Sequence, residues 1–138
     1  MTDKKITRVA DVMTRDLITL PATATVSDAV QLMQKHHTSS IIVERRDAAD
    51  EFGMVVVSDI ANQVLGKDLS PSRVNVYEIM SKPVLTLAAD MNIVYAVRML
   101  ARFRLSRALV VDQDRELLGI VTLRDMVLHR LEEDGGVP

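Results

Sequence analysis

The segment GIVTLRD, residues 119–125, combines residue types that can bind a phosphorylated sugar. Gly119 opens it without a side chain, so a ligand or another backbone can approach closely. The hydroxyl of Thr122 can donate to a phosphate oxygen, and Arg124 can clamp the same group with a bidentate guanidinium. Asp125 can accept two hydrogen bonds from a vicinal diol such as that of ribose. Where such a segment enters a helix, the free N–H groups of the first turn also favour an anion.

The same spacing has a purely structural interpretation. Thr122 and Asp125 match a capping box, in which a hydroxyl and an acidic side chain satisfy backbone N–H groups at the start of a helix. Acidic residues in a first helical turn are stabilised by the helix dipole without any ligand. From the spacing alone, both the capping role and the ligand role stay open for this pair.

A second segment of the same kind, GMVVVSD, covers residues 53–59. An offset of 67 residues places Met13 opposite Met80 and Thr19 opposite Thr86, and the offset falls to 66 at the two glycines, after one extra residue in the first copy. Because the match keeps its register on both sides of this single insertion, we infer that the chain consists of two related repeats.

Both repeats show the same predicted order of elements, β-α-β-β-α. Each begins with a short apolar strand and continues with a helix whose apolar residues recur at i, i+3, i+4 and i+7. Thr25 and Asn92 have side chains preferred at the N-caps of these helices. Apolar runs then predict two further strands, and a closing helix begins near Asp59 or Asp125. The predicted helical stripes are Val26, Ala29, Val30, Met33 and Ile93, Ala96, Val97, Leu100, and the strands contain SIIV, GMVVV, ALVV and GIVT.

The predicted domains are a first repeat over residues 9–66, a linker over 67–75 and a second repeat over 76–133, with flexible tails at 1–8 and 134–138. The linker contains Gly, Pro and Ser and lacks apolar periodicity. Since a repeat of about 60 residues is marginally stable alone, we expect the two repeats to pack against each other with pseudo-two-fold symmetry. The predicted fold class is α+β, with small mixed sheets flanked by helices.

The composition argues against several classes of protein. There is no cysteine, which excludes disulfides, thiolate metal sites and cysteine nucleophiles. A net charge of −2 and only four Phe and Tyr residues argue against nucleic-acid binding. The sequence has no G-x-S-x-G elbow, no phosphate loop and no ligand cluster for a metal, so we expect a protein that is not an enzyme and holds no metal. Without a signal peptide or an apolar run of roughly 18 residues, it is expected in the cytoplasm, with no membrane partner.

Several motifs recur in matching order in the two repeats: DVMTRDLITL and EIMSKPVLTL, then TVSDAVQLM, SRALVVD and GIVTLRD. On these motifs the chain resembles a pair of CBS domains, the cystathionine β-synthase type repeats that associate as a Bateman module, over about residues 9–131. The resemblance implies a regulatory module that binds AMP, ADP or ATP in the cleft between the repeats and relays binding to an effector protein. S-adenosylmethionine and NAD rank below these ligands. It also implies a homodimer and no obligatory cofactor.

The resemblance further assigns roles to individual residues. It implies that Asp125, with Asp59 as its counterpart, binds ribose hydroxyls, and that Thr122 and Arg107 contact phosphate. The backbone of the first strand of each repeat, near Thr19 and Thr86, would read the adenine. The predicted nucleotide-binding residues are Asp125, Thr122, Arg124, Arg107, Gly119, Thr86, Asp59, Thr19 and Ser58.

The first repeat departs from this pattern. Val56 stands where the second repeat has Thr122, Ser58 where it has Arg124, and Ser40 where it has Arg107, while Asp59 remains. We therefore predict one good nucleotide site in the second repeat, and a site in the first repeat that is weaker, empty or suited to a less charged ligand. The alternative is a ligand-free CBS-fold scaffold for dimerisation or interaction, in which the two aspartates only cap helices.

Overall fold

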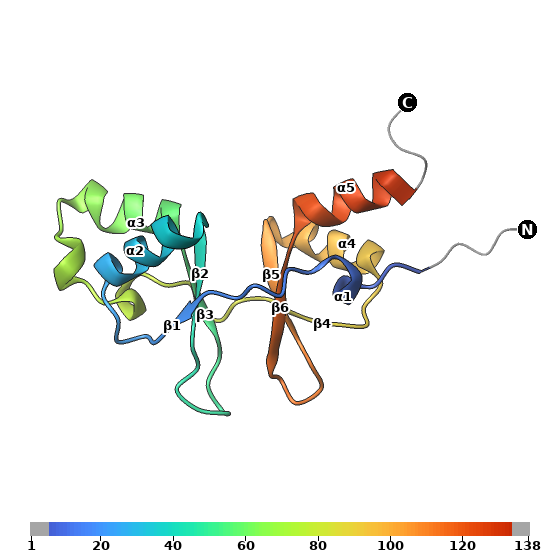
Figure 1. Cartoon of the computed structure of the whole chain (residues 1–138), viewed down its shortest axis with the longest axis horizontal. Coiled ribbons are helices and arrows are strands. Elements are labelled where there is room, and N and C mark those ends of the chain that lie inside the picture. The colour runs from blue at the N-terminus through green and yellow to red at the C-terminus, as the bar shows by residue number, and fades with distance from the viewer. Residues whose placement is uncertain (1–5, 134–138) are drawn as a thin grey trace, which may run out of the picture. The chain divides into compact units, whose positions relative to one another are not determined.

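The computed structural model describes residues 6–133, and the chain divides into two compact units (Figure 1). Unit 1 contains the described residues up to Leu17 and from Leu85 onward, and unit 2 contains Ile18–Val84. The tails expected at residues 1–5 and 134–138 lie outside the described residues.

Each unit contains one β-α-β-β-α series, as the sequence predicts, together with a short opening helix. Unit 2 comprises β1 (Thr19–Leu20), α2 (Val26–His36), β2 (Ser40–Val43), β3 (Gly53–Val56), α3 (Val57–Gln63) and the 3-10 turns η1 (Leu65–Lys67), η2 (Pro71–Arg73) and η3 (Val76–Glu78). Unit 1 comprises α1 (Val9–Val12), β4 (Thr86–Ala88), α4 (Ile93–Phe103), β5 (Arg107–Val111), β6 (Leu117–Thr122) and α5 (Leu123–Glu133).

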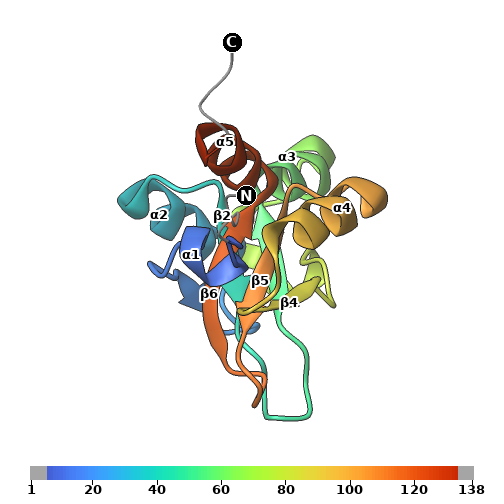
Figure 2. The same cartoon turned by 90° about the vertical axis from the view of Figure 1, so that its right-hand side faces the viewer.

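Both sheets have three strands and the same mixed topology. Their strand orders are β1-β2-β3 and β4-β5-β6, with the first pair parallel and the second pair antiparallel. Helices cover one face of each sheet, and Figure 2 shows α4 and α5 next to each other in unit 1. The predicted α+β fold is therefore confirmed. The cores centre on Leu20, Val26, Ala29, Ile41, Val43, Val55 in unit 2 and on Leu87, Ile93, Ala96, Leu100, Val110, Val121, Met126 in unit 1.

The two long helices start where their caps predict. The Thr25 hydroxyl accepts a hydrogen bond from the Asp28 N–H at 3.1 Å, and the Asn92 side chain accepts one from the Val94 N–H at 2.9 Å. These side chains satisfy N–H groups that have no partner within the helix. Both helices end at a residue in the left-handed conformation, His37 with φ 52° and Arg104 with φ 56°.

The segment that opens each repeat packs in the unit that holds the other repeat's sheet. Val9 N–H donates to the Met91 carbonyl at 2.8 Å, and Thr14 exchanges two backbone hydrogen bonds with Ile120. In the same way, residues 74–81 belong to unit 2, where Val74, expected in the linker, is buried. Residues 6–8, expected in a flexible tail, include the buried Thr7. The spatial units thus differ from the sequence repeats.

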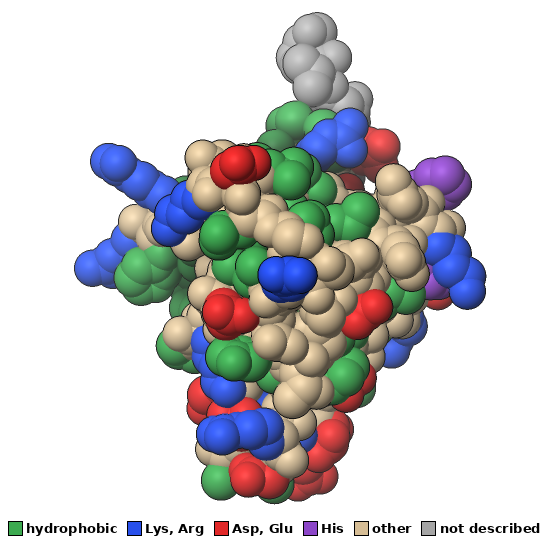
Figure 3. Space-filling view, turned by 90° about the vertical axis from the view of Figure 1, so that its left-hand side faces the viewer, with side chains coloured by type: hydrophobic (Ala, Val, Ile, Leu, Met, Phe, Trp, Pro, Cys, Tyr) green, Lys and Arg blue, Asp and Glu red, His purple; other side chains and the backbone are tan. Residues whose placement is uncertain are grey.

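An ion-pair cluster joins the loop between β2 and β3 to the segment before β4, within unit 2. The Asp50 carboxylate lies 2.7 Å from the Lys82 ammonium and 3.3 Å from the Arg46 Nε. The Lys82 contact, followed by the backbone N–H of Arg46, holds the pKa of Asp50 well below its usual range. Figure 3, which faces unit 2, shows charged side chains of both signs gathered at the lower end, where this loop lies.

Candidate functional site

The strands of unit 1 bring the predicted phosphate-contacting residues together. Arg107 and Thr122 are direct partners in the register of β5 and β6, so their side chains lie on the same face of the sheet. Strand β6 ends at Thr122 and α5 begins at the next residue. The Leu123 N–H donates to the Ser106 carbonyl at 2.8 Å, which fixes the start of α5 against the start of β5. The hydroxyl, the guanidinium and the free end of a helix therefore share one corner of the unit.

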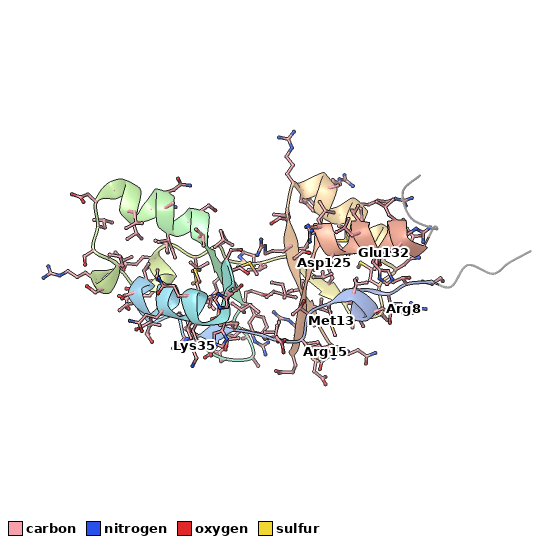
Figure 4. All side chains as sticks on the ribbon, turned by 45° about the horizontal axis from the view of Figure 1, so that its top comes forward. Arg8, Met13, Arg15, Lys35, Asp125 and Glu132 are labelled. Atoms are coloured by element: carbon pink, nitrogen blue, oxygen red, sulfur yellow. The ribbon has the colours of Figure 1, made fainter. Side chains whose placement is uncertain are left out.

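Capping at this corner is performed by Thr122. Its Oγ1 accepts a hydrogen bond from the Asp125 N–H at 3.0 Å. Among the residues that the structure describes, the Asp125 carboxylate has no hydrogen bond and no ion pair, and its side chain is exposed at the start of α5, where Figure 4 labels it. The threonine hydroxyl keeps its own proton to donate. The corner thus offers one free donor and one free carboxylate.

The first repeat uses the equivalent aspartate differently. In unit 2 the Asp59 Oδ2 accepts a hydrogen bond from the Val56 N–H at 3.0 Å. The backbone frame is the same, because Ser40 and Val56 are register partners and the Val57 N–H donates to the Ser39 carbonyl at 3.0 Å. Since valine has no hydroxyl to cap α3, the aspartate performs the capping there. The two repeats therefore place matching carboxylates in matching positions, one engaged and one free.

Charge separates the two corners further. Arg107 and Arg124 flank the Thr122 corner, whereas Ser40 and the exposed Ser58 stand at the matching positions of unit 2. The structure leaves Arg124 exposed and Arg107 half-buried, with its Nε donating to the Ser106 hydroxyl at 3.3 Å. The Thr122 corner of unit 1 therefore presents two cations that the equivalent corner of unit 2 lacks, and these cations favour a bound phosphate.

The predicted first-strand threonines also differ. The Thr19 hydroxyl donates to the Glu44 Oε2 at 2.9 Å. Glu44 adds a negative charge to unit 2 near the first strand. Thr86 in β4 is exposed, and its backbone is in register with Leu109. No sequence signal pointed to Glu44, because a single acidic residue after a strand is common.

Gly119 is required by the chain packed against it. A Cβ at this position would lie 2.8 Å from the Met13 Sδ and 2.8 Å from the Thr14 carbonyl oxygen. Gly53 has the same relation to Met80, at 2.7 Å, and to the Ser81 carbonyl oxygen, at 3.3 Å. The sequence predicts a close approach at Gly119, and the opening segment of the chain makes it. This packing alone requires a glycine here, whether or not a ligand binds.

The described part of the chain contains no group of three or more His, Asp or Glu side chains placed to hold a metal ion. Within the same residues, no helix combines the length and the apolar character needed to cross a bilayer.

The sequence model of the CBS domain matches this chain twice, over residues 9–66 and 76–132. An uncharacterized protein of Methanopyrus kandleri is 32% identical over 120 residues, covering 86% of this chain and 60% of that protein. The chain spans from 24% to 60% of the length of the first curated relatives it matches.

Two solved structures are similar over most of the chain. A hexameric CBS-CP12 protein from bloom-forming cyanobacteria is 34% identical with a TM-score of 0.83, covering 90% of this chain and 68% of that one. The CBS domain of a bacterial CNNM/CorC family Mg²⁺ transporter, solved in complex with ATP, is 25% identical with a TM-score of 0.76, covering 95% and 89%.

Proposed function

Because the chain belongs to the CBS domain family, we propose that it is a non-catalytic regulatory module that binds an adenosine nucleotide at the second repeat. Thr122 and Arg107 would contact phosphate oxygens, and Asp125 would accept from the ribose hydroxyls. Arg124, exposed beside Asp125, would add a second cation. The binding would be relayed to an effector protein through a shift between two states of the module with different affinities for the nucleotide.

The observation that carries this proposal is that the Thr122 hydroxyl, and not the Asp125 carboxylate, caps the start of α5. Thr122 alone caps the Asp125 N–H, so the Asp125 carboxylate is free for a diol. The carboxylates of Asp28 and Asp59 accept from the N–H groups of Thr25 and Val56, whereas among the described residues the Asp125 carboxylate accepts from no N–H group. The ATP complex of the Mg²⁺ transporter CBS domain supports the choice of an adenosine ligand.

A thermal-shift panel tests the proposal, with AMP, ADP, ATP, S-adenosylmethionine and NAD added to the whole chain. A nucleotide at about 100 times its dissociation constant should stabilise the folded state by roughly 2.7 kcal/mol. We expect AMP, ADP or ATP to produce the shift, and Asp125→Ala to abolish it.

Asp59→Ala is the matched control, because it removes the equivalent carboxylate from the first repeat. We expect this variant to keep the nucleotide-induced shift, measured from its own baseline. If no ligand stabilises the wild-type chain, or if only Asp59→Ala loses the response, the proposed site is wrong. The first of these results would favour the ligand-free scaffold.

A homodimer is part of the proposal, and two apolar grooves support it. One groove of about 400 Å³ lies between α4 and α5, and another of about 360 Å³ lies between α2 and α3. Large apolar side chains are exposed at both, including Val127 and Leu131 at the first and Val57 and Leu65 at the second. Each repeat carries one such groove, and a dimer with two-fold symmetry would bury the same groove of both copies with self-complementary contacts.

The hexameric CBS-CP12 relative is consistent with assembly of this kind. Sedimentation velocity should show a dimer for the wild-type chain. We expect Leu65→Asp or Leu131→Asp to shift it toward the monomer, whereas a wild-type monomer at all concentrations would contradict this part of the proposal.

A further inference from the structure

Helix α4 carries an exposed stripe of basic and aromatic side chains on the side opposite its buried residues. The stripe consists of Tyr95, Arg98, Arg102 and Phe103, which are spaced as neighbours on one helical face, and Arg98 also lines the groove between α4 and α5. Tyr95 is 56% exposed and Phe103 is 57% exposed. Two of the chain's four Phe and Tyr residues therefore lie in solvent on one helix, where they do not contribute to the core.

Within the part of the chain that the structure describes, the arginines of this stripe have no acidic partner. The sequence contains no Asp or Glu between Asp90 and Asp112. Among the described residues, Arg98, Arg102 and the neighbouring Arg104 make no ion pair. Arg98 instead places its guanidinium 5.4 Å from the centroid of the Tyr95 ring, a cation–π contact that holds both side chains at the surface.

The fold itself does not require these residues. Helix α2 is the duplicate of α4 and forms the same kind of helix, yet it carries Gln31, Lys35 and His36 where α4 carries Arg98, Arg102 and Phe103. Large apolar side chains are exposed on α4, while none of the described residues of α2 shows one. The stripe is therefore an addition to the second repeat.

We propose that the α4 stripe is the docking surface for an acidic amphipathic helix of the effector protein. Carboxylates on that helix would pair with Arg98 and Arg102, and its apolar side chains would cover Tyr95 and Phe103. Burying aromatic and arginine side chains together is typical of the residues that dominate binding energy at protein interfaces. Nucleic acid fits less well, because the whole chain has a net charge of −2 and the stripe offers only a short row of cations.

The stripe adjoins the proposed nucleotide site through the backbone. Helix α4 ends at Phe103, Arg104 is its left-handed C-cap, and Arg107 opens the next strand. The Ser106 carbonyl between them accepts from the Leu123 N–H, the first residue of the helix that carries Asp125. A partner seated on Phe103 would therefore contact the connection that also positions the phosphate-binding residues. The inference names the partner class for the relay proposed above and rests on that proposal.

Peptide binding to the whole chain, measured by fluorescence anisotropy without nucleotide, tests the inference separately. The probe is a labelled helical peptide of about 16 residues, with glutamates along one face and leucines along the other. The comparison peptides replace every glutamate by glutamine or by lysine. The variant Arg98→Glu with Arg102→Glu reverses two charges of the stripe, and Gln31→Glu with Lys35→Glu places the same side chains at the equivalent positions of α2. Because Arg98 also lines the groove between α4 and α5, sedimentation velocity checks that the α4 variant keeps the oligomeric state of the wild-type chain.

We expect the glutamate peptide to bind more tightly than both comparison peptides and to weaken as salt rises. The α4 variant should lose roughly tenfold or more in affinity, Phe103→Ala should also weaken binding, and the α2 variant should leave it unchanged. Absence of saturable binding by the glutamate peptide, or equal losses in both charge variants, would overturn the inference. Preferential binding of a single-stranded oligonucleotide by the same stripe would also overturn it. Because no nucleotide is present, failure of the nucleotide site leaves these results unaffected.

Discussion

Replacing Asp59 by alanine is expected to destabilise the folded chain more than the same change at Asp125. Asp59 accepts the Val56 N–H at 3.0 Å, and α3 has no side-chain cap at Val56 to replace it. Loss of this cap leaves a half-buried N–H without a partner and should cost about 1 to 2 kcal/mol. Asp125→Ala keeps the bond from the N–H of residue 125 to Thr122, so it should cost only about 0.3 to 0.5 kcal/mol through the helix dipole.

Urea unfolding of the nucleotide-free chain measures this difference, with the slope m showing whether the variants expose similar surface on unfolding. The two aspartate variants should differ by about 1 kcal/mol, or about 4 °C in Tm. Thr122→Val is a third arm, because it removes the cap of the second repeat and should cost about 1 kcal/mol. Equal destabilisation by Asp59→Ala and Asp125→Ala would refute the reasoning, since it would mean that both carboxylates serve as caps.

The remaining predictions concern stability. Val56→Thr should stabilise the chain by about 0.5 to 1 kcal/mol, measured by urea unfolding, because it supplies the hydroxyl cap that α3 lacks; a loss of stability would contradict this. Gly119→Ala should lower the free energy of unfolding by about 1 to 3 kcal/mol, because the new Cβ would lie 2.8 Å from the Thr14 carbonyl oxygen. Gly53→Ala should cost less, because the nearest atom there, at 2.7 Å, is the sulfur of a flexible methionine side chain. A larger loss of Tm for Gly53→Ala than for Gly119→Ala would contradict this prediction. Because the Lys82 and Arg46 contacts depress the pKa of Asp50, their stabilisation should be present above about pH 4 and be lost as the pH falls further. Asp50→Asn should therefore be less stable than wild type near neutral pH and lose less stability on acidification, and parallel curves for the two proteins would exclude this role.

Much of the fold could be predicted because local sequence patterns determine where its helices and strands form. The caps Thr25 and Asn92 and the apolar stripes behind them predict α2 and α4, and both helices begin where expected. The internal match of the two repeats predicts the common β-α-β-β-α order, which the structure confirms. Patterns of this kind depend on neighbouring residues alone.

The placement of the opening segments could not be predicted in this way. Residues 7–14 and 74–81 are short and lack a period, so nothing local states which sheet they pack against. The contact of Asp50 with Lys82 joins residues far apart in the sequence and leaves no spacing signal.

The sequence predicts which residues form the candidate site, but it does not predict which of them cap helices and which stay free for a ligand. The sequence shows that Val56 replaces Thr122 and that both aspartates remain. Only the hydrogen bonds show that the hydroxyl caps the helix in one repeat and the carboxylate in the other. Gly119 is the opposite case, because the predicted close approach exists but Met13 and Thr14 make it.

A crystal structure of the whole chain soaked with AMP tests the central claim most directly. We predict nucleotide in the second repeat, with ribose hydroxyls within hydrogen-bond distance of the Asp125 carboxylate and a phosphate oxygen within reach of the Thr122 hydroxyl. The same positions in the first repeat, near Asp59 and Val56, should be weakly occupied or empty. Water alone beside Asp125, or nucleotide held only by the first repeat, would contradict the account.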